Sequence, residues 1–288
     1  MSNSELPLSG TTQIVGIFGW PVSHSFSPRM HNAAFRELGL DWAYVPFPTP
    51  PEKLGDAIRG FRAMGFRGAN VTIPHKEKAI EFLDGLSPLS EKMGTVNTLY
   101  WEGDRLMGTT TDPWGCLENL RRAGFQPQNQ DIALIGCGGA ARAISFAFAC
   151  DHPEMPITVV FRREDGDQAQ RLQRELIGKT QAAVSLFPLE EFENRAGNFE
   201  LVVNATPVGM HPNEGAVPFP TTRLHDGQCV LDIVYNPRRT QLLAEAQRHG
   251  CKTVEGLGML LHQGAKSFEL WTGKQAPVDA MARALDLG

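Results

Sequence analysis

A glycine-rich turn between an apolar run and a helix of small residues constrains this chain more than any other feature. The run Asp131-Ile132-Ala133-Leu134-Ile135 is short and apolar, as in a strand buried on both faces of a parallel sheet. Gly136-Cys137-Gly138-Gly139-Ala140-Ala141 follows directly. Gly136 permits a tight turn, Gly138 lets a pyrophosphate approach the backbone, and Ala141 is small enough for close helix–strand packing. The pattern predicts a dinucleotide site, although a glycine-rich turn of any α/β protein fits the same six residues.

The composition excludes several classes of protein. The chain has 288 residues, 42% of them hydrophobic and 20% charged, which suits an ordinary globular protein of two domains. A net charge of −5 without a Lys/Arg run argues against a nucleic-acid partner. The N-terminus has no signal-like segment and no apolar run reaches membrane-spanning length, so we expect a cytoplasmic protein. Neither a disulfide frame nor a metal site is expected, because the eight histidines show no metal spacing and no C-x-x-C pair occurs among Cys116, Cys137, Cys150, Cys229 and Cys251.

The first half of the chain predicts an α/β domain with a mixed sheet. Apolar runs predict strands at residues 13–18, 42–47 and 68–73, with helices from Pro28 to Leu38 and over residues 52–64. Ser27 is expected as an N-cap with Pro28 at the first helical position. Residues 96–101 and 105–110 flank Glu102-Gly103-Asp104 and predict a hairpin, which is antiparallel.

The second half predicts a doubly wound Rossmann sheet. Asp112-Pro113 is expected to open a helix to about Ala123, and residues 124–130 form a polar connector. Helices from Met259 onward have no later strand to join, so they are available to dock on the first domain. The predicted strands are residues 131–135, 157–161, 183–187, 201–204, 229–233 and 252–254.

Five polar residues are candidates for chemistry, and most of them have a plainer structural alternative. Ser25 and Ser27, at the positive end of a helix, suit a substrate carboxylate, although Ser27 also suits a helix cap. Lys76 is expected in the first turn of a helix, where the positive end of the helix dipole disfavours a cation. This environment eases loss of the proton and so suits acid–base chemistry. The alternative is an ordinary solvated lysine. Asp112 fits an N-cap, and Asn97 fits the polar start of a strand.

Taken together these segments resemble the shikimate dehydrogenase family, and the match covers nearly the whole chain. The resemblance implies a substrate domain over residues 1–112, completed by helices in 257–288, and a Rossmann domain over 113–256, with the reaction in the cleft. The motifs that carry it are residues 19–32 (GWPVSHSFSPRMHN), 70–76 (NVTIPHK), 94–98 (GTVNT), Asp112, 136–141, 204–210 (NATPVGM), 232–237, 256–260 and 263–265.

The resemblance also implies the chemistry and its residues. Lys76 and Asp112 would be the catalytic pair in reduction of 3-dehydroshikimate to shikimate, a step on the pathway to chorismate and the aromatic amino acids. The substrate would be held by Ser25, Ser27, Thr72, Asn97, Asp112, Tyr235 and Gln263. The cofactor would be bordered by Gly136, Cys137, Gly138, Gly139, Ala140, Ala141, Arg162, Arg163, Asn204, Thr206, Pro207, Met210, Ile233, Gly256 and Met259.

The end of the second Rossmann strand favours NADP over NAD. An NAD site usually places an acid there for the ribose 2′-OH, whereas residues 157–161 run into Arg162-Arg163, which suit a 2′-phosphate. Glu164-Asp165 follow, and one of them is able to bind ribose hydroxyls instead. Two rival functions stay open. One is an NAD-dependent quinate/shikimate dehydrogenase, and the other is a non-catalytic NAD(P)-binding sensor, which would be expected to lose Lys76 or Asp112, whereas this chain has both. We expect shikimate or 3-dehydroshikimate as the partner and a monomer or homodimer.

Overall fold

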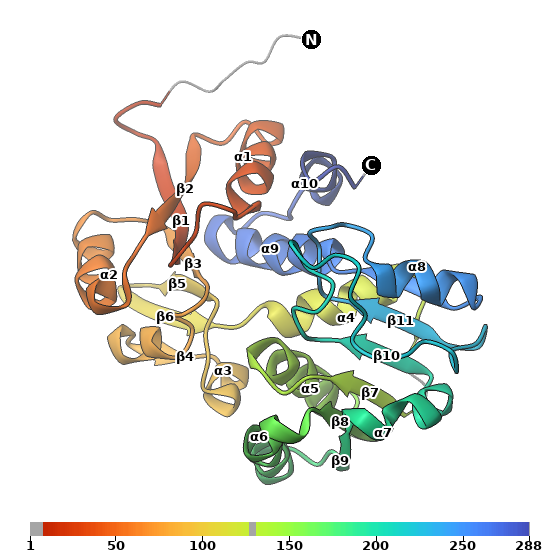
Figure 1. Ribbon diagram of the computed structural model, residues 1–288. Coiled ribbons are helices and arrows are strands. Elements are labelled where there is room, and N and C mark those ends of the chain that lie inside the picture. The colour runs from red at the N-terminus through yellow and green to blue at the C-terminus, as the bar shows by residue number, and fades with distance from the viewer. Residues whose placement is uncertain (1–7, 127–130, 288) are drawn as a thin grey trace. The chain divides into compact units, whose positions relative to one another are not determined.

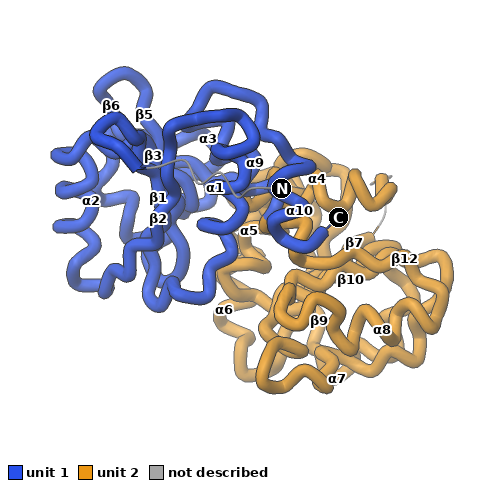
Figure 2. Tube along the Cα trace, turned by 90° about the horizontal axis from the view of Figure 1, so that it is seen from above, with its two compact units in different colours: residues 1–111, 261–288 blue, residues 112–260 orange. Residues whose placement is uncertain are grey.

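The structure is a computed structural model that describes residues 8–126 and 131–287. The chain divides into two compact units (Figure 2). Unit 1 comprises Met1–Thr111 with Leu261–Gly288, and unit 2 comprises Asp112–Leu260. Part of the predicted polar connector, residues 127–130, lies outside the described residues.

Unit 1 is built on a six-stranded mixed sheet in the order β2-β1-β3-β5-β6-β4. β1 pairs in parallel with β2 and β3, whereas β5 and β6 form the predicted antiparallel hairpin. The two-residue strand β4, parallel to β6, was not predicted because so short a segment has no periodicity. The strands are β1 (Gln13–Gly19), β2 (Trp42–Pro48), β3 (Gly68–Val71), β4 (Gly85–Leu86), β5 (Thr98–Glu102) and β6 (Arg105–Thr109).

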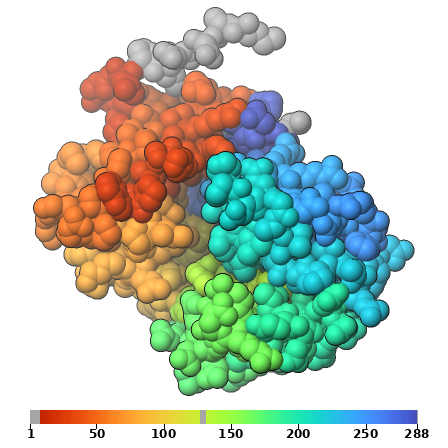
Figure 3. All heavy atoms as spheres, viewed as in Figure 1, coloured from red at the N-terminus to blue at the C-terminus, as the bar shows by residue number. Residues whose placement is uncertain are grey.

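Helices from both ends of the chain belong to unit 1. On α2, Leu54, Ile58 and Phe61 recur at helical spacing and pack with Val71 and Leu99 in one core. α1 packs against α10, and the dark blue C-terminal residues lie beside the orange N-terminal segment (Figures 1 and 3). The helices are α1 (Ser27–Glu37), α2 (Leu54–Ala63), α3 (Pro88–Met93), α10 (Val278–Ala284) and, from residue 261 onward, α9 (Leu257–Thr272).

Unit 2 is a doubly wound parallel sheet in the order β12-β11-β10-β7-β8-β9. The predicted fold class, a mixed α/β unit plus a Rossmann unit, is therefore confirmed. The strands are β7 (Ile132–Ile135), β8 (Ile157–Phe161), β9 (Val184–Pro188), β10 (Leu201–Asn204), β11 (Cys229–Asp232) and β12 (Lys252–Glu255). The helices are α4 (Asp112–Arg122), α5 (Gly139–Asp151), α6 (Gly166–Lys179), α7 (Leu189–Phe192) and α8 (Gln241–Arg248).

Two further observations bear on the expected class of protein. All five cysteines are free. Within residues 8–126 and 131–287, every helix is too short or too polar to cross a membrane.

Candidate active site

The strand order of unit 2 reverses between β7 and β10, and a cavity opens at this point. Parallel sheets bind ligands at the carboxyl ends of their strands where the order reverses. A cavity of about 290 Å³ lies there, lined by Gly136 and Gly138 after β7 and by Thr206 after β10. Its place is the one expected for a nucleotide.

The glycine turn leaves room for phosphates against its backbone. Gly136 has a φ of 106°, and a Cβ there would lie 2.8 Å from Cγ2 of Thr206, so only glycine fits. A Cβ at Gly138 or Gly139 would meet nothing within 4 Å. The 13-residue helix α5 begins here, with its N–H groups and positive dipole end available to an anion. These observations fit a dinucleotide cofactor.

A buried carboxylate and amide hold the Thr206 side of the cavity. Asn204 donates from Nδ2 to Oδ1 of Asp232 (2.9 Å), and its Oδ1 accepts from the N–H of Thr206 (3.1 Å) and from its hydroxyl (2.7 Å). Burial raises the pKa of Asp232 to about 6, against hydrogen bonds from Thr240, Val234 and Asn204 that lower it. Asn204 thus lies behind the cavity and shapes the loop at Thr206.

Arg162 lines the cavity, and its guanidinium is paired with two acidic side chains. Its Nε donates to Oδ2 of Asp165 (2.8 Å), and its guanidinium lies 3.3 Å from Glu164. Asp165 itself lines the cavity. Arg163 is outside the lining and pairs with Glu190 and Glu191 at 3.6 and 3.4 Å. The two adjacent arginines therefore have different environments.

The cavity gathers part of the predicted cofactor set. Gln168 and Leu189 also line it, but no motif of the sequence marked them. Gly256 is close-packed instead, since a Cβ there would lie 2.4 Å from the carbonyl oxygen of Ile233. The predicted residues in the lining are Gly136, Cys137, Gly138, Arg162, Thr206 and Pro207. Those outside it are Gly139, Ala140, Ala141, Arg163, Asn204, Met210, Ile233, Gly256 and Met259.

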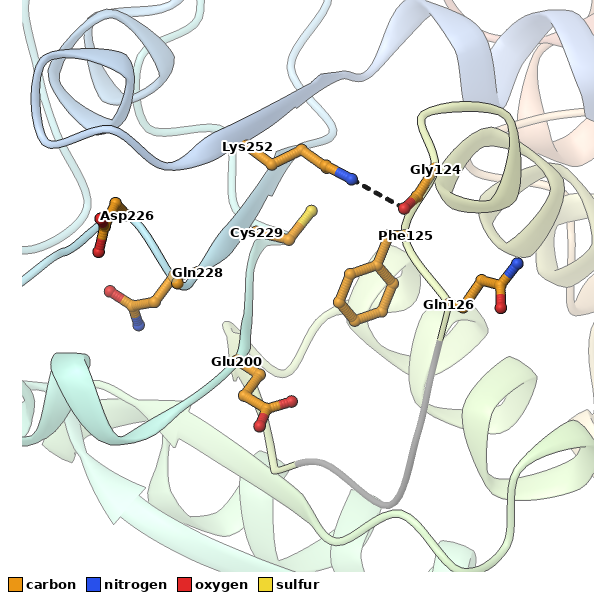
Figure 4. Close-up of a pocket in the computed structure, with 9 residues that line it drawn as sticks. Gly124, Phe125, Gln126, Glu200, Asp226, Gln228, Cys229 and Lys252 are labelled. Carbon is orange, nitrogen blue, oxygen red and sulfur yellow. Dashed lines mark hydrogen bonds between the residues drawn. The ribbon is translucent and has the colours of Figure 1, made fainter.

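A second cavity of about 420 Å³ lies at the amino ends of the strands of the same sheet (Figure 4). Glu200, Gln228 and Lys252 in its lining stand at or just before the first residues of β10, β11 and β12. Lys252 donates from Nζ to the carbonyl of Gly124 at 2.8 Å. These are the amino ends of parallel strands, whereas a nucleotide is expected at the carboxyl ends, so this cavity is not the nucleotide site.

In unit 1, Asn97 and Gln263 meet in a buried polar cluster. Asn97 donates from Nδ2 to Oε1 of Gln263 (3.1 Å) and to Oγ1 of Thr111 (3.0 Å). Its Oδ1 accepts from the N–H of Thr111 at 2.8 Å. Asn97 is only 3% and Gln263 only 8% exposed. Two predicted substrate residues from distant parts of the sequence thus form one polar surface.

Ser27 joins the same hydrogen-bonded system. Ser27 bonds to the hydroxyl of Tyr44, which donates to Oδ1 of Asn70 at 2.7 Å. Burial raises the pKa of Tyr44, so the phenol stays protonated. The expected N-cap role of Ser27 is wrong: Phe26 is the N-cap and Ser27 is the first helical residue, while Oγ of Ser25 accepts from the N–H of Ser27 (3.2 Å). Ser27 is buried, so its hydroxyl lies inside the unit beside Tyr44.

Lys76 lies in a turn before a helix, so the expectation that it lies in the first turn of a helix is wrong. The N–H of His75 donates to the carbonyl of Thr72 (2.9 Å), closing a turn before the short 3₁₀ helix Lys78–Phe82. The buried ring of His75 bonds to the carbonyl of Thr49 at 2.7 Å and fixes this turn. The carbonyl of Lys76 accepts from the N–H of Val96 at 2.9 Å, so Lys76 is anchored beside the segment that leads to Asn97.

Two predicted substrate residues, Asp112 and Tyr235, belong to unit 2. Asp112 is the first residue of α4 and directly follows Thr111, whose N–H bonds to Asn97. Tyr235 is 37% exposed. In unit 1, the N–H of Thr72 donates to the carbonyl of Phe18 at 2.9 Å, which continues the sheet beyond β3. Tyr44, Thr98, Thr111 and Ser267 also belong to the polar cluster, although none of them had been predicted as a site residue. Thr98 alone among these four lies in one of the motifs, residues 94–98.

A Rossmann unit whose turn leaves room for phosphates, together with a unit that carries a buried polar cluster, fits a nucleotide-dependent oxidoreductase. The family model described as "Shikimate dehydrogenase substrate binding domain" matches residues 17–99. The model described as "Shikimate 5'-dehydrogenase C-terminal domain" matches residues 256–285.

Individual relatives extend the match over almost the whole chain. A shikimate dehydrogenase (NADP(+)) of Methanopyrus kandleri is 44% identical over 95% of each chain. The crystal structure of shikimate 5-dehydrogenase from Listeria monocytogenes, in complex with shikimate and NAD, is 39% identical with a TM-score of 0.92, covering 96% of this chain and 98% of that one. Quinate dehydrogenase from Corynebacterium glutamicum, in complex with NAD, is 27% identical with a TM-score of 0.88, covering 95% and 98%. The chain belongs to the shikimate dehydrogenase family.

Proposed function

We propose that this chain is an NADP-dependent shikimate dehydrogenase that reversibly reduces 3-dehydroshikimate to shikimate. This step belongs to the pathway that leads to chorismate and the aromatic amino acids. The observation that carries the proposal is the Asn97–Gln263 pair, a buried polar surface in the unit that contains the matched substrate-binding region. A compact substrate rich in hydroxyls needs such fixed donors and acceptors.

The substrate would be held by the polar residues of unit 1 and by two residues of unit 2. Ser25 and Ser27, at the start of α1, would bind its carboxylate, because hydroxyls and a helix N-terminus both favour an anion. The other proposed substrate residues are Thr72, Asn97, Asp112, Tyr235 and Gln263.

Lys76 and Asp112 would perform the proton chemistry. A bound NADPH supplies the hydride for the carbonyl carbon of the substrate. The ammonium of Lys76 would donate a proton to the carbonyl oxygen and would recover one from the hydroxyl in the reverse direction. The carboxylate of Asp112 would orient that ammonium and the hydroxyl. The anchored turn at Lys76 supports this role, because general acid catalysis needs a fixed donor.

NADP fits the cavity of unit 2. The backbone of residues 138–140 would hold the pyrophosphate, and Arg162 would bind the 2′-phosphate, with Asp165 keeping the guanidinium in place. A second candidate, an NAD-dependent enzyme that also takes quinate, is favoured by one contact: Asp165 lines the cavity and is able to accept from ribose hydroxyls. We further propose a cytoplasmic monomer or homodimer.

The test is conversion of 3-dehydroshikimate by the purified chain. Loss of NADPH absorbance, with shikimate identified by NMR as the product, is the expected result. Binding of NADPH without any consumption in the presence of 3-dehydroshikimate would show a sensor and would refute the proposal.

A further inference from the structure

Three buried polar side chains lie behind the Asn97–Gln263 pair. Asn70 is on β3, Thr98 is the first residue of β5, and Ser267 is on α9. Thr98 and Ser267 are completely buried, and Asn70 is 5% exposed. Burying so many polar atoms costs free energy unless they are paired, and here they are paired with one another.

Ser267 is the centre of this group. Its Oγ accepts from Nδ2 of Asn70 (3.1 Å), lies 2.8 Å from Oγ1 of Thr98, and bonds to the carbonyl of Gln263 (3.1 Å). Gln263 and Ser267 are four residues apart and so lie on the same face of α9. The hydrogen bonds of Ser267 therefore set where α9 presents Gln263 to the sheet.

Thr98 contributes to the orientation of the amide of Asn97. The hydroxyl of Thr98 and the N–H of Thr111 both point to the same side-chain atom of Asn97, at 2.9 and 2.8 Å. A backbone N–H is always a donor, so that atom is Oδ1 and the other is Nδ2. The Nδ2 then faces Gln263, whose facing atom must be the acceptor Oε1. Gln263 consequently directs its NH₂ group to the side away from Asn97.

We propose that Thr98 and Ser267 are positioning residues, which orient the amides of Asn97 and Gln263 so that Gln263 offers a hydrogen-bond donor to an oxygen of the substrate. The inference rests on the proposed function. It assigns no direct substrate contact to either hydroxyl. A donor in a fixed place is matched to a hydroxyl or carbonyl oxygen and rejects an analogue that lacks it.

The experiment compares variants that change the side-chain volume little. Thr98→Val removes the hydroxyl, Thr98→Ser keeps the hydroxyl and removes only the methyl group, and Ser267→Ala removes the central hydroxyl. Thr158→Val is a control for the loss of a strand threonine hydroxyl outside the cluster, because Thr158 lies 2.9 Å from the hydroxyl of Ser185 in a solvent-exposed pair of the nucleotide unit. KM and kcat are measured for shikimate and NADP, and shikimate affinity is measured by calorimetry.

Thr98→Val and Ser267→Ala are each expected to raise KM and Kd for shikimate about tenfold, with KM for NADP within about twofold of wild type. Thr98→Ser and Thr158→Val should behave like wild type, and the double variant should lose less than the product of the two single losses, because the hydroxyls act together. Unchanged shikimate affinity in Thr98→Val, or an equal rise in KM for both ligands, would overturn the positioning role. Wild type that binds shikimate without oxidising it would instead refute the proposed function, while the affinities of the variants still decide the positioning role.

Discussion

Asn97 and Gln263 are 166 residues apart in sequence, yet a hydrogen bond of 3.1 Å joins their side chains in unit 1. One comes from the segment before β5 and the other from α9. Along the sequence, the residues of the nucleotide unit thus lie between the two segments that form this polar cluster. Completing unit 1 requires α9, so truncation before α9 would remove part of the proposed substrate site.

Lys76 is predicted to act in the chemical step. Lys76→Ala should lower kcat by about 10² to 10⁴, the usual contribution of a positioned general acid, with much less effect on shikimate binding. Lys78→Ala is the control, because Lys78 is exposed and pairs with Glu81 at 2.7 Å. Steady-state kinetics of both variants measure the difference, and near-normal kcat in Lys76→Ala would contradict the role.

Ser25 is predicted to bind the carboxylate of shikimate. Ser25→Ala should raise KM for shikimate about tenfold, since a hydrogen bond to a charged group is lost. Oγ of Ser25 also accepts from the N–H of Ser27, so a structural effect must be separated. The alcohol analogue of shikimate, which lacks the carboxylate, serves for this: its affinity should be the same for wild type and Ser25→Ala. An unchanged KM for shikimate would indicate that Ser25 only stabilises the start of α1.

Arg162 is predicted to select NADP. Arg162→Ala should raise KM for NADP about 10- to 100-fold and KM for NAD about twofold at most, because only NADP carries the 2′-phosphate. Arg163→Ala is the matched control, since Arg163 is 70% exposed and pairs with Glu190 and Glu191. Equal losses with the two cofactors in Arg162→Ala would show that Arg162 has only a structural role and would make Asp165 the residue to test.

Sequence patterns predicted most elements of this fold because the signals were local. The strands of the Rossmann unit are apolar runs ended by turn residues, and the hairpin has its turn at Glu102-Gly103-Asp104. Two local predictions were wrong for tertiary reasons. Ser27 has a buried partner in Tyr44, and the turn before Lys76 is held by the buried ring of His75.

The polar cluster was only partly predictable. Asn97 and Gln263 were predicted as site residues through the family motifs, but Ser267, on a helix, lies in no motif, and Thr98 was not predicted as a site residue although it ends the motif 94–98. Their role depends on which elements pack together, and no sequence spacing carries that information. Likewise, Gln168 lines the nucleotide cavity because it lies at the start of α6, which follows β8 in the chain.

His31 is predicted to make stability depend on pH. It is fully buried, stacks on Tyr44 with ring centres 4.5 Å apart, and neither ring nitrogen has a hydrogen-bond partner in the described part of the chain. Burial lowers the pKa of His31 from 6.5 to about 3. Between these values the unfolded chain binds more protons than the native one, so stability falls as pH falls below 6.5.

The variant His31→Phe isolates this effect, because Phe keeps a stacked ring and does not titrate. On going from pH 7.5 to 5.5, wild type should lose about 1.4 kcal/mol more unfolding free energy than His31→Phe. Urea unfolding followed by circular dichroism gives both values. The same pH dependence in the two proteins would mean that His31 is not the group responsible.

The most direct test of the central assignment is one set of steady-state assays in which shikimate or quinate is paired with NADP or NAD. Quinate carries one more hydroxyl, at the carbon that bears the carboxylate, so the Ser25 and Ser27 end of the site must discriminate between the two acids. We predict the highest kcat/KM for shikimate with NADP. A higher kcat/KM with NAD, or comparable values for shikimate and quinate, would contradict the account.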